Sequence, residues 1–163
     1  MSFIVKEGYM RQILHDDVAL LILRLSGLGL AVAHGWTKIS ALATGEGEQM
    51  VAAVASLGFP MPYAFAWAAG SAELIGGGLL AIGLFTRVAA FFAGFTMIIA
   101  AFMRHQFLQQ LLLLFGLIAP STQTIEGWGS PERAMLYLLV CLALLILGPG
   151  RLSLDYLSSS KKR

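Results

Sequence analysis

The sequence predicts an all-α integral membrane protein: a four-helix bundle with short interfacial helices in the outer loops and both termini in the cytoplasm. Apolar residues make up 58% of the 163 positions and charged residues only 12%, whereas about a quarter of a soluble domain is charged. Mean hydropathy is +0.78. The apolar residues gather in four runs, each long enough to cross a bilayer as a helix that satisfies its own backbone groups.

Charge is nearly absent from these runs, which form one membrane domain over residues 18–156. Arg24 is the only charged residue between Val18 and Ala33, and Glu73 is the only one between residues 64 and 85. None occurs between Val88 and Met103 or between Ala134 and Leu147. The predicted spans lie near residues 18–39, 62–85, 87–104 and 131–148.

Both chain ends carry features of a cytoplasmic membrane surface. Residues 1–17 mix charged and apolar side chains, which favours an amphipathic surface helix over a cleavable signal peptide. Residues 157–163 form a basic cytoplasmic tail. Of the eleven basic residues, eight fall on the side of the termini, so the positive-inside rule places the termini in the cytoplasm of a multi-pass inner-membrane protein. The net charge of +2 requires no nucleic-acid partner.

Two outer loops are longer than a hairpin requires. Residues 41–61 place apolar side chains on one face of a short helix suited to the interface, ended by Gly58 and Pro60. Residues 105–118 are too few for a further span, and their glutamines would be costly in lipid. This segment either continues the third helix or forms a second interfacial helix, and both alternatives stay open.

Small and charged residues share a face on each of the first three spans, and such faces are where membrane helices approach closely. The first span has Arg24, Gly27, Ala31, His34 and Lys38 on this face, and the second has Ala66, Gly70, Glu73, Gly77 and Ala81. Glu73 lies near the membrane midplane. It is a functional candidate by default, and an ion pair between Arg24 and Glu73 that locks two helices is an equal alternative.

Three segments resemble the DoxX family: "AHGWTKI" at 33–39, "AELIGGGLLAIGLFTRVAA" at 72–90 and "GPGRLSLD" at 148–155. Their order and spacing, with the four-span layout, extend the resemblance over residues 18–156. It implies a membrane subunit similar to those associated with quinol oxidase and thiosulfate:quinone oxidoreductase. Lipid and other membrane subunits are the partners that such a protein would contact.

The first function class is a quinone-reactive subunit of a membrane oxidoreductase. His34 and Glu73 would be its catalytic residues, and Lys38 would join them in binding a quinone or quinol. No redox centre, metal or haem is expected in the chain, so electrons would come from a partner subunit. The lone Cys141 excludes enzymes that pass electrons through a cysteine pair, and a haem held by His34 and His105 has no other support.

Two other classes stay open. The first is a non-catalytic structural or assembly subunit of a membrane complex. The sequence lacks recognisable cofactor ligands, and its outer loops hold apolar residues suited to the membrane interface, and both features agree with this class. In that case His34 would hydrogen-bond a neighbouring helix and Lys38 would extend to the lipid headgroups. A small-solute carrier is the third class, but the sequence has no convincing internal repeat.

Overall fold

The computed structural model describes residues 3–119 and 130–160, with side chains from His15 onward. Every regular element in this part of the chain is a helix, which confirms the predicted all-α class there. Three helical segments are long and apolar enough to cross a membrane: His15–Thr44, Pro62–Ile82 and Thr86–Arg104. The side chains of the predicted N-terminal surface segment up to residue 14, residues 120–129 before the fourth predicted span, and the basic residues 161–163 lie outside the described part.

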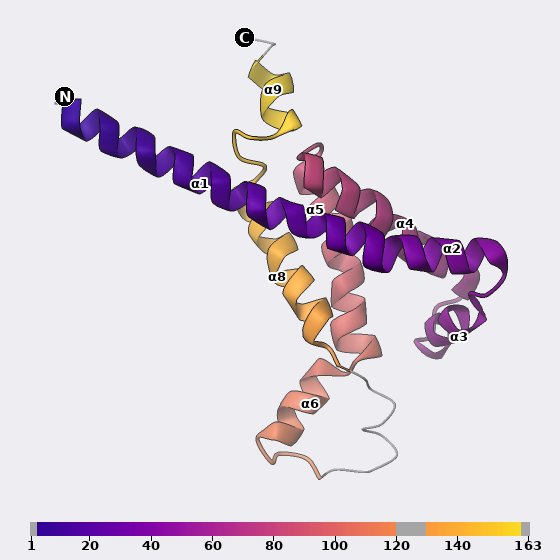
Figure 1. The fold of residues 1–163 in the computed structure, drawn as a ribbon. Helices are drawn as coiled ribbons and strands as arrows, with labels where there is room; N and C mark the ends of the chain where they lie inside the picture. Colours follow the sequence, from indigo (N-terminus) through magenta and orange to yellow (C-terminus); the bar gives the residue numbers. More distant parts are fainter. Residues whose placement is uncertain (1–2, 120–129, 161–163) are drawn as a thin grey trace.

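The first span is the central part of one long rod (Figure 1). The rod consists of α1 (Phe3–Gly29), the π-helical η1 (Leu30–Trp36) and α2 (Thr37–Thr44). Because α1 runs without a break from Phe3 to Gly29, residues 3–17 of the predicted surface segment belong to the same helix as the first span. Backbone angles at the junctions with η1 and α2 also stay helical. The rod ends at Gly45, whose φ of 82° is a left-handed conformation that glycine adopts readily.

The helix predicted in the first outer loop is α3 (Glu48–Ser56), which packs on the next span, α4 (Pro62–Ile82). Pro62 is compatible with the first turn of α4, because a backbone N–H at that position would have no acceptor within the helix. Gly83 ends α4 with a φ of 69°. The second span therefore ends three residues before the predicted boundary at 85.

The third span is α5 (Thr86–Ile98), which continues into the π-helical η2 (Ile99–Arg104). The chain then breaks at His105 and Gln106, where Gln106 has a φ of 52°. A separate helix, α6 (Phe107–Leu114), follows and extends away from the bundle (Figure 1). The structure therefore decides the alternative that the sequence left open: the 105–118 segment holds a helix of its own.

The fourth apolar run forms α8 (Glu132–Leu147), which packs along α5. The helix begins at Glu132, one residue later than the predicted boundary at 131, with Pro131 at the N-cap position; the Glu132 backbone N–H donates to Ser130 Oγ over 3.4 Å. With 16 residues, α8 is shorter than the three segments named above. The chain continues to a short helix, α9 (Leu154–Ser160).

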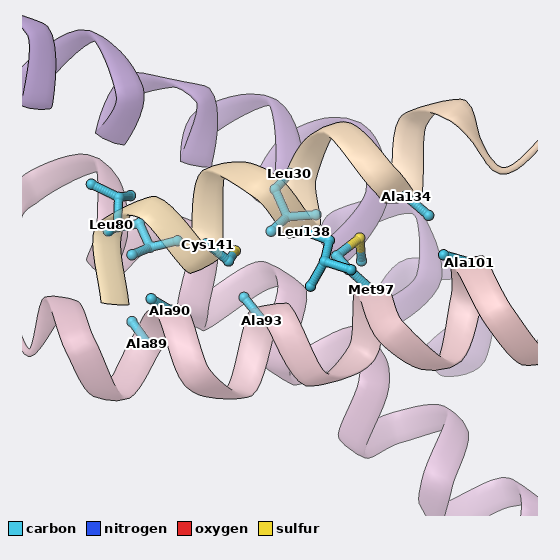
Figure 2. Close-up of a cluster of buried hydrophobic side chains, with 11 residues drawn as sticks. Leu30, Leu80, Ala89, Ala90, Ala93, Met97, Ala101, Ala134, Leu138 and Cys141 are labelled. Carbon is cyan, nitrogen blue, oxygen red and sulfur yellow. The ribbon is translucent and has the colours of Figure 1, made fainter. Parts of the chain in front are cut away.

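The bundle is packed with small side chains inside and large ones outside. Ala93 on α5 lies against the buried Leu138 and Cys141 of α8 in the core (Figure 2). Phe91 and Phe92, on the same helix, are each more than half exposed. Such an arrangement suits lipid as the surrounding solvent, because small residues let membrane helices approach while large apolar ones face the hydrocarbon.

The first turn of α9 and the segment before it connect the ends of other helices. The Asp155 carboxylate accepts hydrogen bonds from the backbone N–H groups of Phe85 and Thr86, at 2.8 and 2.9 Å, which caps the start of α5. The Arg151 backbone N–H donates to Asp17 Oδ1 over 2.7 Å. This end of the bundle holds α9 and the beginning of α1, whereas α3 and α6 lie at the other end (Figure 1).

Candidate functional site

A buried ion pair joins the first two spans at the end of the bundle near α3. Lys38 Nζ, in the first turn of α2, lies 2.5 Å from Glu73 Oε1 in the middle of α4. The Glu73 side chain is only 1% exposed and that of Lys38 is 32% exposed. Removing a carboxylate from water is costly unless a cation compensates it, and Lys38 is the cation that lies against Glu73 in this position.

Gly35 is what lets the two helices come this close. A Cβ atom built there would collide with the backbone of Leu74 and Glu73 on α4. Gly35 also lies in η1, whose i→i+5 turns are wider than those of an α-helix and often mark functional sites. The "HGWTK" stretch therefore combines a close approach at Gly35 with a cation one turn later that reaches Glu73.

The first of two cavities at this pair lies under α3 and is called the α3 cavity here. Its volume is about 280 Å³. Lys38 and Glu73 contribute its polar wall together with Arg104 and His105 at the end of η2. Its remaining lining is mostly apolar and comes from α3, α4, α5 and η2: Met50, Ala53, Val54, Leu57, Ala69, Thr96, Ile99 and Ala100.

The second cavity, called the His34 cavity here, lies on the α8 side of the pair and has a volume of about 250 Å³. It shares Lys38, Glu73 and His105 with the α3 cavity, and Arg133 adds another cation. The His34 ring stands edge-on against Tyr137 of α8, with ring centroids 5.6 Å apart. His34 therefore lines the His34 cavity and not the α3 cavity. Within the described residues, no hydrogen bond joins His34 to Glu73.

One oxygen of Glu73 is buried without a partner. Oε1 receives the Lys38 ammonium, but Oε2 has no hydrogen-bond partner among the residues that the structure describes. Buried polar atoms in proteins are almost always hydrogen-bonded, because an unpaired one costs the full desolvation of the group. Because Glu73 lines both cavities, a ligand bound there that reaches Oε2 would gain a hydrogen bond.

Arg24, the predicted partner of Glu73, lies at the other end of the bundle. Its side chain is fully buried, its Nη2 donates to the carbonyl oxygen of Leu152, and its guanidinium lies against Gly83. Gly83 follows Glu73 by ten residues, about 15 Å along α4 at 1.5 Å per residue. The structure therefore brings Lys38 rather than Arg24 to Glu73, and Arg24 holds the segment before α9 instead.

Several residues around the two cavities were not predicted as site residues. Met50 and Val54 belong to the predicted apolar face of the helix in the first outer loop, and the structure places them in the wall of the α3 cavity. Their helical spacing predicted the apolar face of α3 but not what that face would cover. Tyr137 and Arg133 on α8 had no signal in the sequence, because a single aromatic or basic residue at a helix end is ordinary in membrane proteins.

The described residues include no group of three or more His, Cys, Asp or Glu side chains placed to hold a metal ion. The side chains that meet here are a lysine, a carboxylate, two histidines and two arginines. Together they can donate hydrogen bonds to an oxygen, accept one from a hydroxyl, and exchange protons with a bound ligand.

No curated protein and no solved structure gives a significant match to the chain. The model of the DoxX family matches residues 19–106, more than half of the sequence. This region holds the spans that carry His34, Lys38 and Glu73, and it ends just after η2, which closes the α3 cavity. DoxX is a family of membrane proteins, in agreement with the apolar helices of the structure. The chain belongs to the DoxX family.

Proposed function

We propose that this protein is the quinone- or quinol-binding subunit of a membrane oxidoreductase, with the ligand's head group in the α3 cavity. The observation that supports it is the Lys38–Glu73 pair, buried at one wall of an otherwise mostly apolar cavity of about 280 Å³. Ligand sites are typically apolar with a few convergent polar groups, and this volume lies just below their usual range of about 300–1,000 Å³. A single substituted ring suits that size.

In this proposal each polar group has a separate role. Lys38 donates to one oxygen of the ring and stabilises negative charge that develops there. Glu73 exchanges a proton with the ligand, and the His34 cavity on the other side of the pair gives that proton a polar route toward the end of the bundle near α3. Electrons pass between the ligand and a partner subunit.

The membrane arrangement is part of the proposal. We infer four spans, with α8 and its flanking residues as the fourth, both termini in the cytoplasm and an inner-membrane location. At 1.5 Å per residue the 16 residues of α8 extend over about 24 Å, somewhat less than the roughly 30 Å hydrocarbon core. Packing along α5 and the excess of basic residues near the termini support this layout.

Labelling of introduced cysteines tests the layout in intact cells, in a background where Cys141 is replaced by alanine. We expect an impermeant maleimide to reach Glu46→Cys from the outer side, and Ser160→Cys only after the cells are opened. Labelling of both positions in intact cells would refute an odd number of spans between them, and with it the four-span layout.

Photolabelling tests the binding site directly. We expect an azido-substituted quinone to label peptides containing residues 50–57 or 96–105 of the protein in lipid nanodiscs. Unlabelled decylubiquinone should compete for this labelling. Ala53→Trp should abolish it because the indole fills the cavity, whereas Ser56→Trp should not, since Ser56 is exposed on α3 and does not line the cavity. Labelling that is equal in both variants would refute a quinone site under α3.

A second candidate is a non-catalytic structural or assembly subunit. The feature that favours it is the highly exposed apolar chain at the end of α6 and directly after it, where Leu114 is 78% exposed and Phe115 and Leu117 are each 69% exposed. The test is quinone-dependent turnover of the native complex, with His34→Gln and Glu73→Gln compared at matched assembly. Unchanged turnover in both variants would favour the assembly role over the quinone site.

A further inference from the structure

The unpaired oxygen of Glu73 sets a requirement on any ligand of the α3 cavity. Oε2 is buried and has no hydrogen-bond partner among the described residues, while Oε1 is held by Lys38. A carboxylate that is paired with an ammonium is ionised and can only accept hydrogen bonds. The group that satisfies Oε2 must therefore bring a donor of its own.

The two redox forms of a quinone differ in this property. A quinone carries carbonyl oxygens, which are acceptors only, so one placed beside Oε2 would set two acceptors against each other. A quinol carries hydroxyl groups, each of which can donate to Oε2. Hydrogen bonds between a neutral donor and a charged acceptor are among the strong ones in proteins.

Lys38 does not discriminate between the two forms. Its ammonium has three N–H groups, and one of them is committed to Glu73 Oε1. The others can donate to a quinone carbonyl or to the lone pairs of a quinol hydroxyl. Discrimination therefore depends on Glu73.

We propose that the α3 cavity selects the reduced, hydroxyl-bearing form of its ligand, with one quinol hydroxyl donating to Glu73 Oε2. This inference rests on the proposed function, because it names which form of that ligand the site binds. It makes Glu73 the residue that determines redox-form specificity, and Lys38 the cation that pairs with its other oxygen.

The experiment compares three ligands of nearly equal size: durohydroquinone, duroquinone and the dimethyl ether of durohydroquinone. Each is titrated calorimetrically, without oxygen, into the full chain in lipid nanodiscs, and heats from empty nanodiscs are subtracted. We expect durohydroquinone to bind at least about tenfold more tightly than either of the others, as expected for one hydrogen bond to a charged group. The ether separates the effect of the donor from that of ring electronics.

The matched variants are Glu73→Gln and Thr96→Val. The glutamine amide offers both donor and acceptor atoms, so the preference for durohydroquinone should fall to within about threefold. Thr96 lines the same cavity, but its hydroxyl already donates to the Ala93 carbonyl oxygen over 2.8 Å, so Thr96→Val should keep the preference. Because the result is a ratio of two affinities on one sample, partial unfolding of a variant cancels.

The outcomes separate the two proposals. Equal affinities, a preference for duroquinone, or a preference that survives Glu73→Gln would overturn the redox selection and leave the quinone site in place. Binding of all three ligands no better than to empty nanodiscs would overturn the quinone site itself, and the selection with it.

Discussion

The Lys38–Glu73 pair predicts an energetic coupling between α2 and α4. Replacing Lys38 with Met leaves a carboxylate that is 1% exposed without its cation. Breaking a buried pair costs about 3–5 kcal/mol, and the partial exposure of Lys38 places this change near the lower end, at about 3 kcal/mol. Glu73→Gln leaves a lysine that can turn toward water, so we expect a loss of only about 1–2 kcal/mol.

The double variant should cost less than the sum of the two single ones, because neither residual charge is then left alone. We expect a coupling of about 1–2 kcal/mol, within the range for residues in direct contact. Unfolding by sodium dodecyl sulfate, followed by circular dichroism on detergent-purified protein, measures each free energy. Glu46→Gln, at an exposed loop position, is the control and should stay within about 0.5 kcal/mol of the native protein.

The same cycle run with Arg24 distinguishes the observed pairing from the one predicted from the sequence. Arg24→Met and Glu73→Gln should be additive within about 0.5 kcal/mol, since Arg24 lies against Gly83, about 15 Å along the α4 axis from Glu73. Coupling to Arg24 together with additivity for Lys38 would refute the reasoning.

The remaining predictions concern packing and capping, and the same unfolding assay measures both. Gly35→Ala should destabilise the protein by about 1–3 kcal/mol because the new methyl group meets the α4 backbone at Leu74. Gly78→Ala, at a helical position with no atom within 4 Å, should be neutral or stabilising, and equal effects of the two alanines would contradict this. Asp155→Ala should cost about 0.5–2 kcal/mol through loss of the α5 cap. Asp16→Ala, at an exposed position, should change little, and a loss as large as that at Asp155 would argue against the cap.

The sequence by itself determined the solvent in which this protein folds and the residues worth testing. The long runs without charge indicate membrane spans and not the core of a soluble domain. In lipid, a helix is stable because it satisfies all of its own backbone hydrogen-bonding groups. Because ionisable groups are rare inside these runs, the sequence alone identifies Glu73 as a candidate site residue. Helical spacing also placed His34 and Lys38 on one face of the first span, since that face depends only on residues in the same helix.

Only the tertiary structure decided which cation meets Glu73 and where the cavities lie. Periodicity along one helix gives the direction of each side chain but not the axial offset between two helices. That offset depends on the contact of Gly35 with α4 and on the wide turns of η1, and neither leaves a periodic signal. The α3 cavity forms where helices distant in sequence meet the end of η2. The walls of this cavity therefore depend on how separate segments pack together. The same packing brings Lys38, and not Arg24, next to Glu73.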